Sequence, residues 1–391
     1  MSAARPVELL TALVSAIEGA GPPIVPYAAD APVPTLPRVR RGQLPEGLAA
    51  VVATSGSTGE PKLVQLTADN FLASAQAAHA VLHGPGQWLL AIPAHHVGGL
   101  QVLVRAWLGA GPPDVLEPAG GFTARRFVAA VARMSATGSA RYVSLVPTQL
   151  GRLLQSASGR DALAGFDAVL VGGAATPAAT REQARAHGVR LVRTYGMSET
   201  CGGCVYDGVP LPVTEVHIDN DRHVVLGGRT VAHGYLGKRA LSADRFQTDP
   251  DGVRWFRTDD LGALDDTGRL TVTGRADDLI NTGGVKVAPG PIEDALVRFV
   301  PGVRDAVVVG VADPEWGQVV AAVLTLVPHA SSTPTVADTR ALLRGILPDH
   351  ALPRIVAVVD DLPHLPSGKP DRVSLSGLLG ARIAPEGGER R

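Results

Sequence analysis

The pattern of apolar and polar positions changes twice along the chain. From about residue 48 to residue 235, short β-rich runs such as LAAVVA and DAVLVGG alternate with alanine-rich stretches of helical period. Such alternation is typical of βα units on a mostly parallel sheet. From Thr214 to Val272 the runs become short alternating strands, with turn residues at Asp251-Gly252 and Thr267-Gly268. This stretch predicts a small antiparallel β subdomain.

A third pattern begins after Gly274. It contains three β-rich runs, DAVVVGV, VVAAVLTLV and RIVAVV, among helical stretches, and it predicts a compact α+β unit of about a hundred residues. We place the boundary at Arg275 to Asp278, which gives domains of residues 1–276 and 277–391. The predicted fold is α/β, with a large N-terminal domain of βα units plus a small antiparallel β subdomain, followed by a small α+β C-terminal domain.

The same patterns place individual elements. An amphipathic helix is expected from Leu9 to Ile17, followed by an extended, irregular, proline-rich segment over residues 21–37. Further strands are expected at WLLAIP, YVSLVP and VRLVRTYG. Further helices are expected over residues 71–82, 99–108, 127–133, 291–299 and 336–347.

Composition and charge exclude several functional classes. The chain has 391 residues, and its 36 Lys and Arg against 37 Asp and Glu indicate neither nucleic acid nor a membrane surface as a partner. Hydrophobic residues make up 45% of the chain, yet no apolar run approaches the ~20 residues of a membrane span. Two cysteines cannot form a disulfide framework, and no basic-then-apolar signal sequence begins the chain, so we expect a cytoplasmic protein. A homo-oligomer is compatible with this composition.

The segment Thr54–Lys62, TSGSTGEPK, concentrates hydrogen-bond donors. Its glycines let backbone N–H groups turn toward one point, and its hydroxyls and lysine add further donors there. A multiply charged oxyanion such as a triphosphate needs this concentration of donors. The residues concerned are Ser55, Gly56, Ser57, Thr58, Gly59 and Lys62.

The surroundings of this segment predict its local structure. The run VVA before it is typical of a strand end, and the alanine-rich stretch after Asp69 is typical of a helix, so a strand–loop–helix turn is expected. The segment does not follow the Walker pattern, because Pro61 stands where that pattern has glycine. A Ser/Gly-rich surface loop is the alternative interpretation.

Two pairs of residues suggest metal or redox chemistry, and each pair has a simpler alternative. Cys201 and Cys204 form CGGC, but a zinc site needs two more ligands and the chain has no second Cys pair. The alternative is that Cys201 and Cys204 are simply small residues that fit beside a crowded site. His79 and His83 are four apart on an expected helix without an evident third ligand, so a packed or solvated pair competes with a metal site.

Five further segments carry residues suited to chemistry. VGGAA, from Val171, and TYGMSET, from Thr194, each end a predicted strand, and two glycines let backbone approach a flat ring. WFRTDDLG contains Asp259 and Asp260 just before a turn, and GRADDLINTGGVKV follows it. LPSGKPDR places Lys369 in a Pro/Gly/Ser loop close to the C-terminus. Each alone has a simple explanation, such as a strand end or a solvated lysine, but their order and spacing together indicate one site.

In this order the segments resemble the adenylate-forming superfamily of acyl-CoA synthetases, peptide-synthetase adenylation domains and luciferases. The resemblance covers about residues 48 to 372. TSGSTGEPK is similar to the family's phosphate loop, and TYGMSET to its Tyr-Gly-x-Thr-Glu motif, with Ser198 in place of threonine. RTDDLG is similar to the Thr-Gly-Asp motif, with Asp259 in place of glycine. GRADD resembles the hinge motif, and SGK resembles the loop of the catalytic lysine.

The resemblance implies ATP and CoA as co-substrates, Mg²⁺ as cofactor, and a role for each matched residue. The loop from Thr54 to Lys62 would hold the β and γ phosphates, and Ser198 would contact the α-phosphate. By the same resemblance, the adenine would contact Gly172, Gly173, Tyr195 and Gly196, the ribose Asp260 and Arg275, and Mg²⁺ the carboxylate of Glu199.

The chemistry agrees with these roles. A carboxylate that attacks the α-phosphate brings two anions together, so catalysis must come from charge neutralisation and alignment, which Lys369 and Mg²⁺ would supply. For transfer to a thiol, the mobile C-terminal domain of the family swings about a hinge residue that matches Asp277. Gly283 and Gly284 resemble the glycines that line the tunnel for CoA. The alternatives are a solubilising loop lysine for Lys369 and a solvated turn for Asp277 and Asp278.

The acyl pocket is expected in the segment AIPAHHVGGLQVLVRAWLGAG. His96 matches the histidine of the family's Pro-x-x-His-x-x-Gly motif, and a hydrogen-bonded core histidine is the alternative. Arg105 lies in an otherwise apolar helix, where an unpaired charge is costly. It forms an internal salt bridge, reaches solvent, or binds the second carboxylate of a dicarboxylic substrate. Thr148 and Gly196 are expected along the slot for an aromatic ring.

Within the superfamily, three segments are similar to the o-succinylbenzoate–CoA ligases of menaquinone biosynthesis. They are HVGG from His96 followed by RAWL from Arg105, VGGAATP, and TYGMSETCGG. This resemblance implies AMP-forming activation of o-succinylbenzoate and its transfer to CoA. One rival is another aryl- or fatty-acyl-CoA ligase, or a stand-alone adenylation domain that serves a carrier protein. A second rival is a non-catalytic nucleotide-binding module, against which the retention of Lys369 and Glu199 argues.

Overall fold

The protein divides into two compact units, each described below by itself. The first consists of Met1–Thr176, Thr180–Thr258 and Leu264–Thr271, and the second of Pro177–Ala179, Asp259–Ala263 and Val272–Arg391. The predicted domain boundary between residues 276 and 277 stays a prediction. The structure is a computed structural model that describes the chain except residues 3–4, 40–41, 43, 55–61, 117–120, 135–137, 331, 364–369 and 384–391, and the side chains of 381–383.

A seven-stranded sheet forms the centre of the first unit. Its strand order is β4-β3-β5-β6-β7-β8-β9, with parallel pairing from β4 to β7 and antiparallel pairing from β7 to β9. The prediction of βα units on a mostly parallel sheet is therefore confirmed. The strands are β3 (Gly86–Leu90), β4 (Asp114–Val115), β5 (Ala140–Leu145), β6 (Ala168–Val171), β7 (Leu191–Met197), β8 (Gly202–Tyr206) and β9 (Val209–Pro210).

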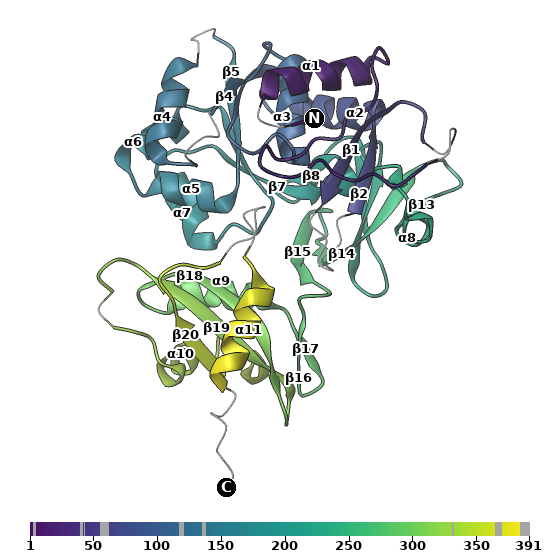
Figure 1. Cartoon of the computed structure of the whole chain (residues 1–391). Helices are drawn as coiled ribbons and strands as arrows, with labels where there is room; N and C mark the ends of the chain where they lie inside the picture. Colours follow the sequence, from purple (N-terminus) through teal and green to yellow (C-terminus); the bar gives the residue numbers. More distant parts are fainter. Residues whose placement is uncertain are drawn as a thin grey trace. The chain divides into compact units, whose positions relative to one another are not determined.

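Helices cover both faces of this sheet, because successive residues of a strand point to opposite sides. Trp88 and Tyr142 point into one apolar core with residues of α1, α2 and α3. Their neighbours Leu89 and Val143 point into a second core with residues of α4, α5 and α6. Figure 1 shows these two groups of helices on opposite sides of the sheet. The helices are α1 (Pro6–Ile17), α2 (Ala68–Val81), α3 (Val97–Trp107), α4 (Ala124–Arg133), α5 (Pro147–Leu154), α6 (Ala157–Ala164) and α7 (Ala178–Ala186).

The four helices expected in this part of the chain are confirmed as α1, α2, α3 and α4, with ends that differ by a few residues. The short helices α5, α6 and α7 were not predicted. They have eight or nine residues each, too few to establish a clear helical period in the sequence. Residues 21–37 form no helix or ladder strand, as expected from their prolines, and contribute only isolated bridges such as Ile24 with Ala50.

The phosphate loop does not lead directly into a helix, so the predicted strand–loop–helix turn is wrong. The strand β1 (Leu48–Thr54) is followed after the loop by β2 (Lys62–Thr67), which pairs antiparallel with it, and β12 (Gly234–Tyr235) extends the sheet. The run KLVQLT buries Val64 and Leu66 in the core, which favours a strand. The helix α2 begins only at Ala68, where Thr67 and Asn70 form a reciprocal capping box.

The expected antiparallel subdomain is confirmed as a five-stranded sheet. Its order is β10-β11-β14-β13, and β15 pairs with β14. Both β14 and β15 contain residues of the first unit and of the second. The elements are β10 (Thr214–Ile218), β11 (His223–Gly228), α8 (Arg239–Arg245), β13 (Phe246–Thr248), β14 (Arg254–Leu264) and β15 (Leu270–Arg275).

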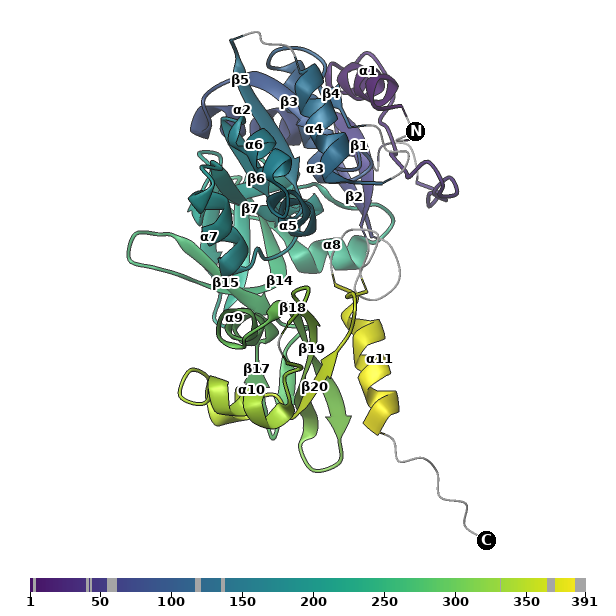
Figure 2. The same cartoon turned by 90° about the vertical axis from the view of Figure 1, so that its left-hand side faces the viewer.

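The second unit is a mixed sheet with helices on both faces. Its strand order is β17-β16-β19-β18, and β20 pairs parallel with β19. One core contains residues of α9 and α10, and the other contains Leu375 and Leu379 of α11. Figure 2 shows α11 on one side of the strands and α9 and α10 on the other. The elements are β16 (Ile280–Thr282), β17 (Val285–Val287), α9 (Pro289–Phe299), β18 (Val303–Asp313), β19 (Gly317–Leu326), α10 (Val336–Leu343), β20 (Ile355–Val358) and α11 (Arg372–Ile383).

This unit confirms the expected α+β character and corrects one helix end. The helix expected over residues 336–347 stops at Leu343, because Gly345 adopts φ +84°, a left-handed conformation that ends helices. The hairpin of β16 and β17 and the helix α11 were not predicted. No helix in the described ranges combines the length and hydropathy of a membrane span.

Candidate active site

The carboxyl ends of two parallel strands form one edge of the predicted nucleotide site. Gly172 and Gly173 directly follow β6, while Tyr195 and Gly196 lie near the end of the adjacent strand β7. A Cβ atom on Gly172 would overlap the Thr194 side chain, so glycine permits the close approach of these strand ends. Ligands of open α/β sheets bind at the carboxyl ends of the strands. The structure therefore brings these four predicted residues together at the expected edge.

Glu199 is the second residue beyond β7, in the short 3₁₀ helix η1 (Ser198–Thr200). It is buried, with 8% of its surface exposed, and its Oε1 accepts a hydrogen bond of 2.9 Å from the Tyr235 hydroxyl. Its backbone carbonyl accepts a hydrogen bond of 2.8 Å from the Ala232 N–H. A carboxylate oxygen is the hard ligand that Mg²⁺ prefers. Ser198, the residue predicted to contact the α-phosphate, is its immediate neighbour.

The described residues fit a magnesium ion that is shared with a nucleotide. Within the described ranges, no group of three or more His, Cys, Asp and Glu side chains is arranged to hold a metal ion without other ligands. Mg²⁺ commonly takes one or two carboxylates and completes its coordination with substrate phosphates and water. Glu199 supplies such a carboxylate beside the strand ends where a nucleotide is expected.

Lys62 begins β2, where the phosphate loop ends. Thr54, the last residue of β1, pairs with it across the hairpin, so the two ends of the loop are adjacent. Lys62 Nζ lies 5.5 Å from the centroid of the Tyr235 ring, and Tyr235 therefore contacts both Lys62 and Glu199. The other predicted phosphate-binding residues, Ser55, Gly56, Ser57, Thr58 and Gly59, lie outside the described residues.

Tyr235 is a site residue that the sequence analysis missed. It follows Glu199 by 36 positions, so no local spacing connects the two residues. The tyrosine in HGYLGK belongs to no segment that the sequence analysis singled out. Its place in the site becomes evident only from the pairing of β12 with β2.

His96 lies at the N-terminal end of α3, at the wall where the acyl pocket is expected. Burial, and to a smaller extent the neighbouring His95, lower the pKa of His96 to about 4, so its ring is neutral at physiological pH. Its Nε2 is buried without a hydrogen-bond partner among the described residues. Gln149 donates a hydrogen bond of 2.9 Å to the Ala91 carbonyl just after β3, which holds the start of α5, and with it Thr148, near the same strand end.

Arg105 lies in the last turn of α3, at the opposite end of the helix from His96. The helix α3 runs back along β3, and at its C-terminal end the Ala110 N–H contacts the carbonyl of Gly86, the first residue of β3. Only 3% of Arg105 is exposed, and its guanidinium carbon lies 5.5 Å from the centroid of the Trp88 ring. The alternative that it reaches solvent is therefore wrong, and the described part of the chain offers it no carboxylate partner. Its charge acts on the buried Cys201 thiol and the Tyr206 hydroxyl, and among the described residues no hydrogen bond or ion pair joins it to another predicted site residue.

In the second unit, Arg275 is surrounded by carboxylates. It pairs with both oxygens of Asp277 at 2.8 Å and with Asp260 Oδ1 at 3.4 Å. Asp259, the residue that departs from the family motif, lies 3.6 Å from the same guanidinium. Burial by itself would lower the pKa of Arg275, but the three neighbouring carboxylates raise it, so the guanidinium stays charged. The structure thus brings Asp260 and Arg275, both predicted for the ribose, into contact.

Two details of this region differ from expectation. Asp259 and Asp260 lie within the 11-residue strand β14, and not just before a turn, because alternate residues such as Phe256 and Thr258 are buried along it. The hinge candidate Asp277 is ion-paired with Arg275, so it is more than a solvated turn residue. Its role in domain movement stays a prediction.

Gly283 and Gly284 form the two-residue turn between β16 and β17. Their φ angles are +59° and +83°, left-handed values that such a hairpin turn requires and that glycine adopts readily. The Gly283 N–H donates a hydrogen bond of 2.8 Å to the Trp316 carbonyl, which fixes the turn against the start of β19. Lys369, the predicted catalytic lysine, lies outside the described residues.

The cysteines and the two histidines show no sign of metal or redox chemistry. Cys201 and Cys204 are free and fully buried, and burial raises the pKa of each thiol to about 12, which keeps both protonated. Gln101 donates a hydrogen bond of 3.1 Å to Cys201 Sγ. His79 is packed inside α2, whereas His83 is exposed beyond the end of that helix, so they do not share a site.

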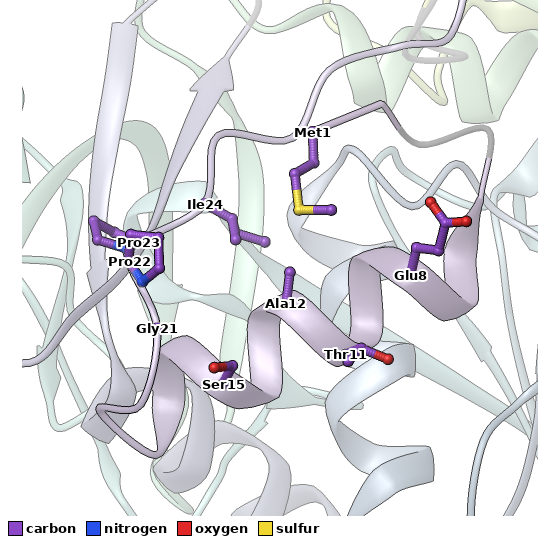
Figure 3. A pocket seen from close by; sticks show the side chains of 9 residues that line it. All are labelled: Met1, Glu8, Thr11, Ala12, Ser15, Gly21, Pro22, Pro23 and Ile24. Carbon is purple, nitrogen blue, oxygen red and sulfur yellow. The ribbon is translucent and has the colours of Figure 1, made fainter.

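A surface pocket elsewhere in the first unit does not contain the predicted residues. It has a volume of about 490 Å³ and lies between α1 and the proline-rich segment that follows it. Figure 3 shows that side chains such as Ala12, Ser15 and Ile24 line it. The residues predicted for the adenine lie instead at the ends of β6 and β7.

Comparisons with known proteins identify the family and the fold. A family model described as AMP-binding enzyme matches residues 11–236, and one described as AMP-binding enzyme C-terminal domain matches residues 291–369. A Mycobacterium tuberculosis protein named probable 2-succinylbenzoate–CoA ligase is 44% identical over 375 residues, which cover 94% of each chain. The 2-succinylbenzoate–CoA ligase of Listeria monocytogenes is 31% identical, over 84% of this chain and 69% of that protein.

Solved structures show the same fold. The o-succinylbenzoate CoA synthetase (MenE) of Bacillus subtilis, in complex with the acyl-adenylate intermediate OSB-AMP, matches with a TM-score of 0.70 and 28% identity, over 84% of this chain and 69% of that chain. ATP-bound MatB of Rhodopseudomonas palustris matches with a TM-score of 0.75 and 27% identity, over 85% of this chain and 68% of that chain. The predicted fold class and the resemblance drawn from the motifs are both confirmed. The chain belongs to the AMP-binding enzyme family.

Proposed function

We propose that the protein is an ATP-dependent, AMP-forming acid–thiol ligase that activates o-succinylbenzoate and transfers it to CoA, a step of menaquinone biosynthesis. The observation that carries this proposal is that Tyr235 contacts both Lys62, at the start of β2, and Glu199, just beyond the carboxyl end of β7. The relatives named 2-succinylbenzoate–CoA ligase, one of which matches 94% of the chain, support the choice of acid and thiol.

In the first half-reaction, a carboxylate oxygen of the acid attacks the α-phosphorus of ATP. A new P–O bond forms, and the bond from the α-phosphorus to pyrophosphate breaks. Lys62 and the loop before it hold the β and γ phosphates, Ser198 contacts the α-phosphate, and Tyr195 stacks on the adenine. Mg²⁺, held by Glu199, supplies positive charge that offsets the phosphate charge. Asp260 and Arg275 bind the ribose hydroxyls.

Lys369 acts between the two anions that react. Its ammonium group contacts the attacking carboxylate and the α-phosphate, which aligns them and neutralises their repulsion. The loss of one such preorganised donor typically lowers the rate on the order of 10²–10³-fold, about 3–4 kcal/mol.

In the second half-reaction, the CoA sulfur attacks the carbonyl carbon of the acyl-adenylate. The thiol proton is lost, a C–S bond forms, and the bond from the carbonyl carbon to AMP breaks. Lys369 must move away from the acyl-adenylate before the CoA thiol can reach it. We propose that residues 277–391 rotate about Asp277 to allow this. The Gly283-Gly284 turn then lines the path of the pantetheine arm, where only small residues leave room.

The acyl group binds beside His96 and Thr148. Because the His96 ring is neutral at physiological pH, it offers a hydrogen bond to the substrate without adding charge. Its buried, unpartnered Nε2 supports this role, because a buried polar atom normally has a partner. ATP and CoA are cytoplasmic metabolites, which supports a cytoplasmic location.

The test of this proposal is ATP- and CoA-dependent thioester formation with o-succinylbenzoate, beside benzoate and a medium-chain fatty acid. We expect release of pyrophosphate and AMP with o-succinylbenzoate and little turnover of the other acids. Pyrophosphate release without any dependence on CoA would point to a carrier-protein thiol. If none of the acids leads to pyrophosphate or AMP, the proposed function is wrong.

A substitution at Lys369 separates the two half-reactions. We expect Lys369→Ala to lose ATP–pyrophosphate exchange while it retains most of the transfer of preformed o-succinylbenzoyl-adenylate to CoA. Lys238→Ala, at another lysine of the chain, is the matched control and should leave both half-reactions unchanged. Equal losses of Lys369→Ala in both half-reactions would contradict the mechanism.

A further inference from the structure

Tyr235 is held rigidly between β2 and the 3₁₀ helix that follows β7. It lies on β12, opposite Val64 of β2, and only 3% of it is exposed. Its ring packs edge-to-face on Phe246 with the ring centroids 5.2 Å apart. Its backbone N–H donates a hydrogen bond of 2.9 Å to Ser242 Oγ. These contacts fix both the ring and the direction of the hydroxyl.

The two polar neighbours of this side chain carry opposite charges. The hydroxyl donates to Glu199 Oε1 at 2.9 Å, inside the buried part of the unit. Lys62 Nζ lies 5.5 Å from the ring centroid, within the range of a cation–π contact. One aromatic residue thus contacts the two described groups that the proposed function assigns to the triphosphate and its magnesium ion.

The backbone before Tyr235 strengthens this link. The Ala232 N–H donates to the Glu199 carbonyl at 2.8 Å, and Asn70 Nδ2 donates to the Val231 carbonyl at 3.0 Å. The segment that leads into β12 is therefore attached both to η1 and to the first turn of α2. A tyrosine on this segment cannot move independently of Glu199.

We propose that Tyr235 is a positioning residue that orients the Glu199 carboxylate toward magnesium and supports Lys62 beside it. This inference rests on the proposed function, because it assumes that Glu199 and Lys62 serve the same Mg·ATP. The hydroxyl acts on the carboxylate and the ring acts on the ammonium group, so the two effects can be separated by substitution. Groups that orient a metal ligand in this way typically change metal affinity by about 10–100-fold.

The test measures binding of ATP without any acid substrate, by calorimetry, in the presence of Mg²⁺ or of EDTA. Tyr235→Phe keeps the ring and removes the hydroxyl. We expect it to weaken binding of Mg·ATP by about 10–100-fold and binding of metal-free ATP by less than about threefold. Tyr235→Leu also removes the ring, and we expect it to weaken binding of both forms, because Lys62 loses its support.

Tyr142→Phe is the matched control. Tyr142 is also fully buried, and its hydroxyl donates to the Gly84 carbonyl at 2.9 Å, ahead of β3. Its loss should leave both binding constants unchanged. A second measurement uses Glu199→Gln: in that background, Tyr235→Phe should have little further effect on Mg·ATP binding, because the oriented carboxylate is already absent.

The possible outcomes separate this inference from the function on which it rests. If the wild-type protein binds ATP in neither buffer, the proposed function fails. If the wild type binds Mg·ATP and Tyr235→Phe binds it equally well, only the inference is wrong. Equal weakening of both ATP forms by Tyr235→Phe, or an undiminished effect in the Glu199→Gln background, would also overturn it, because Tyr235 would then act only through general stability.

Discussion

The ion pair between Arg372 and Glu293 gives a prediction whose size can be worked from the structure. Arg372 begins α11 and donates to both oxygens of Glu293, at 2.7 and 3.2 Å, and to the Val308 carbonyl at 2.6 Å. Glu293 also accepts the Val308 N–H at 2.8 Å. The side chains of Arg372 and Glu293 are 27% and 19% exposed, so the pair is largely removed from water. This network joins α9, β18 and α11.

The perturbation is Arg372→Met, which keeps the apolar stem and removes the guanidinium. Breaking a fully buried pair costs about 3–5 kcal/mol, because the remaining charge stays unpaired. Exposed pairs contribute only about 0–1 kcal/mol. Since this pair is partly accessible, we expect a loss of about 2–3 kcal/mol in the stability of the second unit. That loss corresponds to a change of about 30- to 150-fold in the equilibrium for opening, at 1.4 kcal/mol for each factor of ten.

Native-state hydrogen exchange of the β18 and β19 amides measures this change directly. The matched control is Arg304→Met, because among the described residues Arg304 pairs only with its neighbour Asp305, at 3.0 Å, where the side chains are 34% and 49% exposed. That control should change protection by less than about threefold. We expect the double variant Arg372→Met with Glu293→Leu to regain part of the loss, because the Glu293 carboxylate no longer stays unpaired, whereas Asp278, 3.7 Å from Arg372, still loses its partner. Wild-type protection in Arg372→Met would refute this reasoning.

Two further predictions concern the first unit. The pKa of His96 is lowered from 6.5 to about 4, so the unfolded chain takes up a proton before the folded protein does. Stability should be unaffected above about pH 6.5 and fall as the pH drops towards 4, by about 3 kcal/mol at most, and denaturant unfolding of His96→Gln should show a flatter pH profile. Because Arg105 is buried over Trp88 at the far end of α3, we expect Arg105→Met to lower the melting temperature and to change the KM of o-succinylbenzoate and of a monocarboxylic analogue alike. A rise in KM for the dicarboxylic acid alone would place Arg105 in the substrate site, as the sequence suggested.

Much of the site could be predicted from sequence because its motifs are local. Gly172 and Gly173 end one predicted strand, and Tyr195 and Gly196 lie near the end of the next, and the carboxyl ends of parallel strands meet at one edge of a sheet. Glu199 follows within the same motif. The structure confirms this part of the arrangement, since β6 and β7 are neighbours in the sheet.

Other features could not be predicted, because they depend on strands that are far apart in the chain. Because β2 pairs with β1 and β12, a strand follows the phosphate loop where a helix was expected. The same pairing places Tyr235 next to Lys62. The direction of α3 along β3 carried Arg105 away from His96, although both lie in one predicted segment. Asp259, which departs from the family motif, could be explained only from the structure, where it pairs with Arg275.

The sequence by itself determined the family, the order of the elements and the residue types of the nucleotide site. Apolar periodicity and glycine-rich motifs act over a few residues, and their information is therefore present in the linear chain. The tertiary structure alone decided which polar and charged groups meet, as for Tyr235 with Glu199 and Arg372 with Glu293. Such partners are separated by 36 and 79 positions, and their contact depends on strand order and helix packing, which no local pattern encodes.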